Sequence, residues 1–409
     1  MLRKIALWIF ICSMVGILSG TTSALFLWSL DLISNFRESN LYIIWGLPFV
    51  GIIVGYIYQR STYEVQQGNN TIIWAYQNKK STVPFLMAPI IFLTTLMTHL
   101  VGGSAGREGT AVQMSTSIAI LFQSTFTSLR KFKKTLIQMG IASGFSGIFG
   151  TPLAGILFSV ELFLSKKQNL HSLFPVIISS FLSHFICVYF WGIEHTEYHI
   201  FSDFKFTVGS AISMILAGIV FGLTARFFTF TTRLFSNIGH KLFSVLWLKA
   251  MCGGFILVLL YMIFDCSQYQ GLGITTIERS FYLESDISVF FIKILLTTFT
   301  LSWGFKGGEV TPLFFVGATL GSALSGFLGI PIDLMAGFGF IAVFAAATHS
   351  PISSTVMGIE LFGTEYTYCF LVISLIAHFV SGKVGIYGAQ KSWMQKIKFE
   401  NFICREVQG

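Results

Sequence analysis

Long stretches without a charged residue set the first limit on what this chain can fold into. They occur at residues 5–30, 81–106, 109–129, 135–160, 168–193, 206–225, 310–332, 334–359 and 366–382. A helix needs about 20 apolar residues to cross a lipid bilayer. Only 11% of the 409 residues are charged, about half the share found in soluble domains. The sequence therefore predicts an all-α polytopic membrane protein.

The basic residues stand in short clusters between these runs, at Arg3-Lys4, Arg130 to Lys134, Lys166-Lys167 and Lys391 to Arg405. Lys and Arg near the ends of membrane spans tend to stay in the cytoplasm. The net charge of +8 thus indicates topology and not nucleic-acid binding. We expect an integral protein of a bacterial inner membrane with both termini in the cytoplasm.

Glycine and proline interrupt the apolar runs, as at Gly144-Phe-Ser-Gly147 and Gly150-Thr-Pro152. Non-helical backbone at membrane depth is tolerated only where protein buries it or water solvates it. Broken helices therefore favour a transporter or channel over a structural scaffold.

An internal repeat supports this interpretation. The stretch TPLAGILFSVELF at 151–163 aligns with SPISSTVMGIELF at 350–362, an offset of 199. GREGT at 106–110 aligns with GGEVT at 307–311, an offset of 201, which pairs Glu108 with Glu309. Transporters built from two such halves place their site at the midplane, on the N-termini of discontinuous helices. The alignment leaves open whether the repeat is parallel or inverted.

The repeat defines the expected domain organisation. Residues 1–390 form a single transmembrane domain, with halves at about 1–200 and 201–390. Residues 391–409 form a short basic cytoplasmic tail, with no soluble regulatory domain. Glu161 and Glu360, nine residues after the matching prolines, are expected to serve helix packing or a dimer contact.

The GREGT segment carries the first candidate for chemistry. The N-terminus of a helix presents unpaired N–H groups and a positive dipole end, which together bind anions. Gly106 and Gly109 allow a close approach of the backbone. A carboxylate at Glu108 can then fill an anion site as a tethered anion, and protonation empties that site. The alternative is that Glu108 pairs with Arg107 or caps its own helix.

These motifs resemble those of the CLC family of anion channels and proton-coupled antiporters. The resemblance rests on GREGT followed by AVQM, on PLAGILFSVE, and on GGEVTPLFFVGATLG, and it extends over about residues 40–390. It implies a fold of two inverted halves with broken helices. It also implies a homodimer with one anion pathway in each protomer.

Several positions depart from the chloride-handling pattern of that family. Asn69 stands where the GSGIP loop has serine, Thr110 replaces the proline of GREGP, and Val310 replaces the phenylalanine of GxFxP. These departures resemble the fluoride/proton antiporter branch. An amide brings two N–H donors where a hydroxyl brings one donor, which suits a strongly hydrated ion; alternatively, Asn69 simply forms a turn after Gly68. The residues expected along the anion path are Gly68, Asn69, Gly106, Arg107, Gly109, Val310, Thr311 and Tyr387.

The resemblance also concerns the proton. The chloride exchangers carry an internal glutamate near the end of the PLAG helix, and the matching residue here is Leu162. Glu309 offers a replacement acid, and Thr311 could hydrogen-bond Glu309 or the ion. The resemblance implies that protons visit both Glu108 and Glu309. The alternative for Glu309 is a buried acid that caps its helix.

The leading prediction is thus a proton-coupled antiporter that exports fluoride from the cytoplasm in exchange for H⁺. A chloride or nitrate exchanger and a passive anion channel of the same fold remain as alternatives. An enzyme is disfavoured, because the chain has no HExxH motif and no paired Asp/Glu motif with a nucleophile. No cofactor or metal is expected: His195 and His199 have a suitable spacing but no third ligand, and we expect them in a solvated loop.

Overall fold

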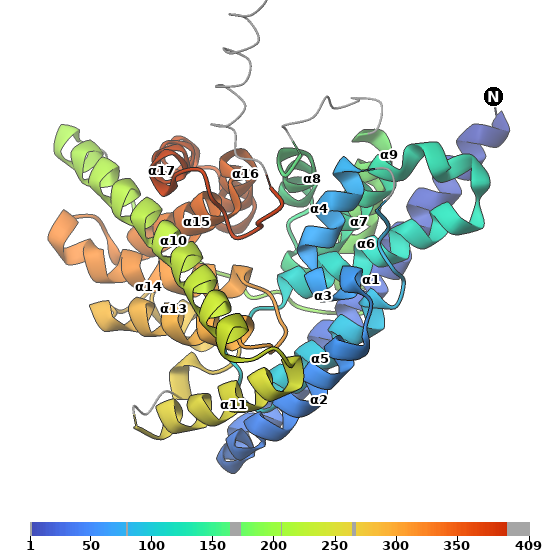
Figure 1. Cartoon of the computed structure of the whole chain (residues 1–409). Coiled ribbons are helices and arrows are strands. Elements are labelled where there is room, and N and C mark those ends of the chain that lie inside the picture. The colour runs from blue at the N-terminus through green and yellow to red at the C-terminus, as the bar shows by residue number, and fades with distance from the viewer. Residues whose placement is uncertain (1, 79–80, 164–172, 206, 264–266, 391–409) are drawn as a thin grey trace, which may run out of the picture.

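The apolar runs fold into helices almost without exception (Figure 1). The computed structural model describes residues 2–78, 81–163, 173–205, 207–263 and 267–390. The predicted tail at 391–409 and the pair Lys166-Lys167 lie outside the described residues. The helices are α1 (Leu2–Ser39), α2 (Leu47–Arg60), α3 (Tyr63–Gln67), α4 (Asn69–Gln77), α5 (Met87–Leu100), α6 (Glu108–Thr125), α7 (Lys133–Phe149), α8 (Pro152–Glu161), α9 (Leu173–Phe185), α10 (Val208–Leu242), α11 (Leu246–Ile263), α12 (Ile274–Arg279), α13 (Ile287–Ser302), α14 (Val310–Leu328), α15 (Ile332–Thr348), α16 (Pro351–Phe362) and α17 (Thr367–Ser381).

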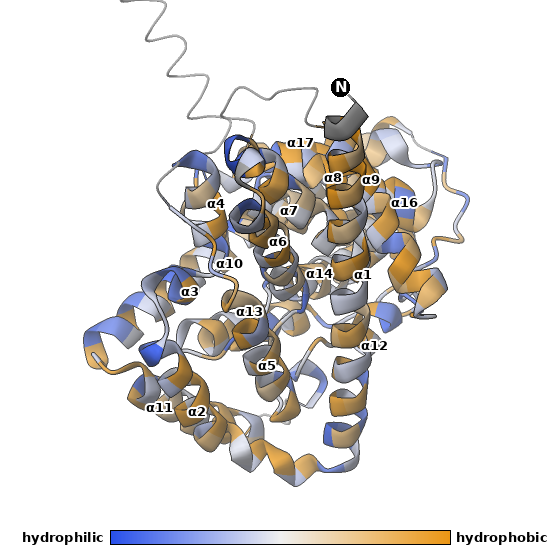
Figure 2. Ribbon diagram, turned by 90° about the vertical axis from the view of Figure 1, so that its right-hand side faces the viewer, coloured by the Kyte–Doolittle hydropathy of each residue, from blue (hydrophilic) through white to orange (hydrophobic). Residues whose placement is uncertain are grey.

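Six helical segments of the described chain are long and apolar enough to cross a bilayer. They are Ile5–Ser39, Leu41–Arg60, Leu173–Phe190, Val208–Leu242, Leu246–Ile263 and Val310–Leu328. Figure 2 shows hydrophobic residues along the length of α1 and α5 and hydrophilic residues in α3 and the surface loops. The prediction of an all-α membrane protein is confirmed.

The predicted helix breaks occur at equivalent places in the two halves. In the first half α7 ends at Gly150, which has φ of 75°, and Pro152 starts α8. In the second half α15 ends at His349, which has φ of 53°, and Pro351 starts α16. A left-handed residue closes a helix, and a proline is favoured in the first turn of the next. Each break therefore follows from local sequence.

Glu161 and Glu360 tie the two halves together reciprocally. The Glu161 carboxylate accepts hydrogen bonds of 2.9 and 2.7 Å from two backbone N–H groups in the first turn of α16. The Glu360 carboxylate accepts bonds of 2.9 and 2.8 Å from the first turn of α8. Each acid thus caps a helix of the other half, an exchange that suits a pseudo-two-fold relation between repeats. The expected role in helix packing is confirmed.

Loss of this capping should lower stability measurably. Replacing Glu161 with alanine leaves two N–H groups of α16 without an acceptor, and loss of a cap costs about 0.5–2 kcal/mol. We expect the thermal unfolding midpoint of Glu161→Ala in detergent to fall by several degrees. Glu365→Ala, which removes an exposed acid, should leave the midpoint unchanged. Equal midpoints for the two variants would contradict this account.

Candidate functional site

The starts of α6 and α14 meet near the centre of the molecule. Gly106 and Gly308 form an antiparallel bridge, and each donates an N–H to the carbonyl of the other at 2.6 Å. A Cβ on Gly308 would lie 2.9 Å from the backbone nitrogen of Gly109, so only glycine permits this approach. The bridge brings the positive ends of two helix dipoles, one from each half, to one place. This is the geometry that the GREGT and GGEVT repeat predicted.

Glu108 occupies that meeting point. Its side chain is buried, with 1% exposure. Oε2 accepts hydrogen bonds from the backbone N–H of Thr311 at 2.9 Å and from that of Arg107 at 3.1 Å. Oε1 accepts the Thr311 hydroxyl and lies 3.7 Å from Nε of Arg107. A carboxylate from one half therefore sits on the first turn of α14 in the other half, where a helix N-terminus binds anions.

Thr311 has a different partner from one that the sequence suggested. We considered that Thr311 could bond to Glu309, whereas both its N–H and its hydroxyl are directed to Glu108. The alternative pairing of Glu108 with Arg107 is real but secondary, because the Thr311 contacts are shorter. Capping of α6 by Glu108 is not seen, since no bond from the first turn of α6 reaches its carboxylate among the described residues.

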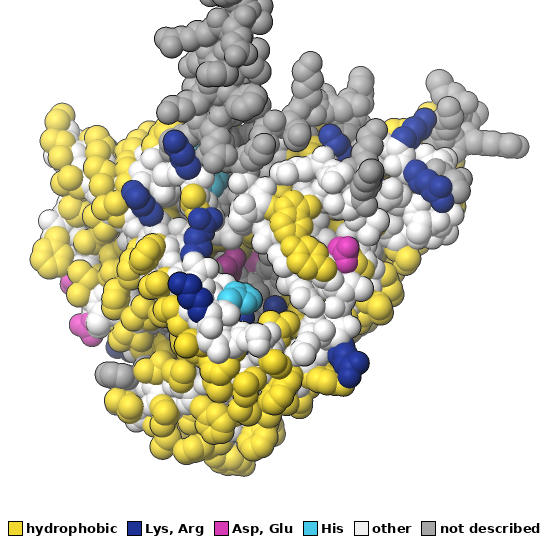
Figure 3. Space-filling model, in the orientation of Figure 1, with side chains coloured by type: hydrophobic (Ala, Val, Ile, Leu, Met, Phe, Trp, Pro, Cys, Tyr) yellow, Lys and Arg dark blue, Asp and Glu magenta, His cyan; other side chains and the backbone are white. Residues whose placement is uncertain are grey.

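Glu309 stands immediately before α14 and faces open space. Its side chain makes no capping bond to α14, so the capping alternative is wrong. It lines a cavity of about 360 Å³ together with Tyr58, His240, Lys249 and Lys306. Figure 3 shows this hollow, with Lys and Arg side chains around it and acidic and histidine side chains inside.

A second cavity, of about 270 Å³, adjoins the first and shares Glu309 and Lys306 with it. Its other polar lining includes Asn69, Gln113 and Tyr387. We call the two cavities together the vestibule. Three residues that the sequence predicted on the anion path, Gly68, Asn69 and Tyr387, therefore line the same space as Glu309, although they come from distant parts of the chain.

Comparison with known proteins decides the family. The family model described as voltage gated chloride channel matches residues 50–382, more than half of the chain. The chain belongs to the CLC family. A chloride/fluoride channel protein of Pseudomonas syringae pv. tomato is 37% identical over 397 residues, covering 96% of this chain and 88% of the relative.

Solved CLC structures agree with the fold. The crystal structure of a CLC-type fluoride/proton antiporter superposes with a TM-score of 0.91 at 32% identity, covering 96% of this chain and 99% of that one. A slow cyanobacterial Cl⁻/H⁺ antiporter superposes with a TM-score of 0.80 at 17% identity, covering 98% and 99%, which shows the fold alone. The chain thus has the CLC fold, and the resemblance seen in the motifs is confirmed.

The residues that depart from the chloride-handling CLC pattern have distinct surroundings. Asn69 opens α4 after Gly68, which has φ of 55°. Its amide nitrogen lies 3.0 Å from the place that a Cβ on Gly109 would take, and its Oδ1 is buried without a hydrogen-bond partner in the described chain. Asn70, not Asn69, connects this turn to the end of the described chain, because its Oδ1 accepts the N–H of Ala389 at 3.0 Å. A turn-forming role therefore fits Asn70 better than Asn69.

The other two departures lie in packed surroundings. Val310 belongs to the main hydrophobic core and is 3% exposed. The Thr110 hydroxyl bonds to that of Thr95 on α5 at 2.9 Å. A proline could not make this bond, so Thr110 links α6 to α5.

Sequence reasoning missed Lys306 and Gln113 in the vestibule. Nζ of Lys306 lies 4.0 Å from the centre of the Tyr58 ring, a cation–π contact. The Gln113 side chain packs against Gly68. Lys306 stands three residues before Glu309, and Gln113 belongs to the AVQM segment. A search for polar residues flanking the motifs would have found both.

The two histidines weighed as metal ligands separate in space. His199 is exposed and lies 3.6 Å from the Glu197 carboxylate. His195 packs against Gly150 and is not in a solvated loop, contrary to expectation. The described residues include no group of three His, Cys, Asp or Glu arranged to hold a metal ion.

Proposed function

We propose that this CLC protein is an antiporter that exports fluoride from the cytoplasm in exchange for protons. The observation that carries the proposal is the Glu108 carboxylate on the first turn of α14, bonded to the N–H and hydroxyl of Thr311. An ionised acid there competes with a mobile anion for the same donors. The 37% identical chloride/fluoride channel protein and the fluoride/proton antiporter structure support the choice of ion.

The proposed cycle follows from this competition. While Glu108 is ionised, it holds the donors of Thr311 and closes the path between the two helix N-termini. A proton that arrives on Glu108 removes its charge, so that fluoride takes over the N–H groups. Gly106, Gly109 and Arg107 provide the close backbone and the positive charge around this exchange.

Glu309 is proposed as the second coupling group. It stands at the start of α14 and lines the vestibule, so it can exchange protons with solvent there. Gly68, Asn69, Val310 and Tyr387 complete the proposed anion path, and Asn69 and Tyr387 line the vestibule. Leu162, at the place of the usual proton relay, packs in an apolar pocket beside Asn69 and Tyr387, which leaves Glu309 to carry the proton.

The same proposal includes the setting of the protein. Residues 1–390 form one transmembrane domain of an ion transporter, not an enzyme, in a bacterial inner membrane with both termini in the cytoplasm. The basic rim of the vestibule supports a cytoplasmic position for that face (Figure 3). Helices α8, α9, α16 and α17 lie in a row (Figure 1) and expose large apolar side chains, such as those of Phe174 and Tyr368, which supports a homodimer through this row.

Ion-specific electrodes test the choice of anion. Vesicles that hold the purified protein and are loaded with fluoride or chloride should release fluoride much faster than chloride. Comparable rates would replace the fluoride proposal with the chloride exchanger. A fluoride flow that ignores an imposed proton gradient would instead indicate a passive channel.

Asn69 is expected to contribute to this selectivity. Asn69→Ser replaces two N–H donors with one hydroxyl, and each lost hydrogen bond to a charged group is worth about 1.5–3 kcal/mol. The fluoride-to-chloride rate ratio should therefore fall about tenfold or more. Asn70→Ser, which changes the neighbouring amide that bonds Ala389, is the matched control and should keep the ratio. An unchanged ratio in Asn69→Ser would remove Asn69 from the selective site.

A further inference from the structure

A buried lysine lies outside the site described above. Lys293 on α13 is 0% exposed, and its Nζ donates to the carbonyls of Tyr269 at 2.9 Å and Gly271 at 3.0 Å. The same ammonium lies 4.8 Å from the centre of the Phe315 ring. Within the described chain no carboxylate forms an ion pair with Lys293. Its positive charge is therefore not neutralised by a neighbouring acid.

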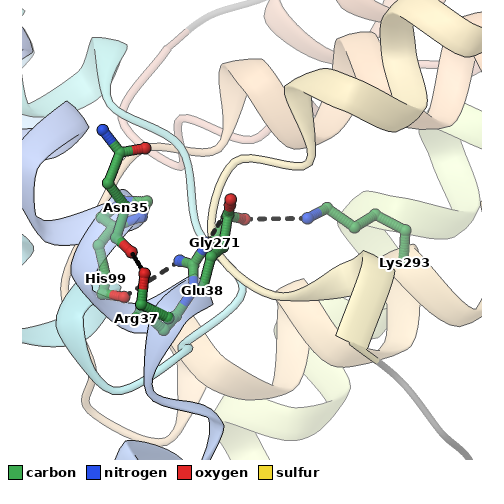
Figure 4. Close-up of polar contacts among 7 residues, drawn as sticks. Asn35, Arg37, Glu38, His99, Gly271 and Lys293 are labelled. Atoms are coloured by element: carbon green, nitrogen blue, oxygen red, sulfur yellow. Dashed lines mark hydrogen bonds and ion pairs between the residues drawn. The ribbon is translucent and has the colours of Figure 1, made fainter.

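A second buried cation approaches the same glycine. Arg37, near the end of α1, is 7% exposed, and its Nη1 donates to the carbonyl of His99 at 3.2 Å. A Cβ on Gly271 would lie 2.5 Å from that Nη1. Its acidic partner, Glu38 at 3.2 Å, is 66% exposed, so water weakens this pairing. Figure 4 shows Arg37 and Lys293 reaching Gly271 from opposite sides.

Both cations hold the segment that leads to Glu108. Gly271 donates its N–H to the carbonyl of Gly103 at 3.2 Å. Nε2 of His99 lies 3.4 Å from the carbonyl of Gly106, which forms the bridge to the other half. One turn after Lys293, the Thr297 hydroxyl bonds to that of Ser104 at 2.8 Å. Arg37 thus contacts residues 99–106, the segment that precedes Glu108, directly, and Lys293 is linked to the same segment through Gly271.

Arg37 and the vestibule lie at opposite ends of one membrane span, and Lys293 approaches Arg37 at Gly271. The segment Leu41–Arg60 starts four residues after Arg37. Near its other end, Gly55 and Tyr58 line the vestibule. An anion that leaves the vestibule and passes Glu108 therefore moves towards Arg37 and Lys293.

Hydrogen bonding alone does not account for charges in these places. Neutral amide side chains could donate to the same carbonyls without the cost of removing a charge from water. Ionisable groups at membrane depth are expensive and are usually retained for function. We propose that Lys293 and Arg37 form a fixed positive platform that stabilises the transported small inorganic anion on the side of Glu108 away from the vestibule. The inference rests on the proposed function, since it assumes that an anion takes this route.

Charge and hydrogen bonding at Lys293 can be separated by substitution. Lys293→Gln keeps a donor and loses the charge, Lys293→Met loses both, and Lys293→Arg keeps both. Coulomb's law with an effective dielectric constant near 20 predicts that losing this unit charge slows transport on the order of tenfold. We expect this loss of fluoride efflux from vesicles in Lys293→Gln and near-normal efflux in Lys293→Arg. The exposed Lys205→Gln serves as control.

Two further readouts distinguish this role from structural support. The fluoride-to-proton ratio of Lys293→Gln should equal that of the wild type, because Glu108 and Glu309 are unchanged, and its thermal midpoint should stay within a few degrees. Fluoride efflux should be slowed to the same extent in Arg37→Gln. This variant replaces Lys293→Gln in the test if Lys293→Gln does not fold. Wild-type efflux in either glutamine variant, with loss only in Lys293→Met, would overturn the platform. Absence of fluoride efflux from wild-type vesicles would instead refute the proposed function.

Discussion

Replacement of Glu108 by glutamine is expected to abolish proton transport. Glutamine has nearly the same shape and keeps an oxygen that can accept from Thr311, but it cannot ionise or deliver a proton. Removing a proton-transfer group typically costs a factor of about 100 or more. Fluoride-driven proton uptake into vesicles should therefore fall to background, and any remaining fluoride flow should no longer respond to a proton gradient.

The control for Glu108→Gln is an acid away from the path. Glu365→Gln changes an exposed carboxylate and should leave fluoride and proton fluxes at wild-type rates. Proton uptake that survives in Glu108→Gln would show that the proton travels by another group. In that case the Thr311 bonds of Glu108 would serve only to join α6 to α14.

Replacement of Glu309 by glutamine is expected to have the second-largest effect. The Glu309 carboxylate makes no hydrogen bond or ion pair within the described chain, so its loss removes no structural contact. It is also the acid that lines the vestibule beside Lys306. We expect proton uptake to fall about 100-fold, as for other proton-transfer groups, with an unchanged thermal unfolding midpoint.

Glu64→Gln is a suitable comparison for Glu309→Gln. Glu64 lies on α3 and precedes Val65, which lines the vestibule, but Glu64 is not itself a lining residue. Its substitution should leave proton uptake unaltered. Equal proton uptake by Glu309→Gln and Glu64→Gln would show that Glu309 has no part in the cycle. Protons would then have to reach Glu108 without a second acid.

Much of the fold could be predicted because its determinants are local. Uncharged runs specify membrane helices, and Gly150 with Pro152 ends one helix and starts the next within three residues. The limits of helices were harder to predict. Helix α10 extends from Val208 to Leu242, well beyond the uncharged run 206–225, and carries Arg226 and Arg233. A long helix can continue past the apolar run with charged side chains facing water, and periodicity alone does not mark where that happens.

The site was predicted in part. The repeat placed Glu108 and Glu309 at equivalent helix starts, because the motif that starts each helix is local in sequence. The partner of Glu108 was not predicted, since Thr311 is 203 residues away and only the folded chain brings them together. The position of Lys293 was missed for the same reason: a lysine within an apolar helix gives no sign of which loop it will meet.

The central claim is that the Glu108 carboxylate and fluoride compete for one binding site, and that this competition couples fluoride transport to proton transport. The most direct test is proton uptake by vesicles that hold the purified wild-type protein and an outward fluoride gradient, with no proton gradient at the start. The account predicts that protons enter against their own developing gradient as fluoride leaves, in a fixed ratio to the fluoride released. Fluoride release without proton entry, whether fast or slow, would contradict the claim.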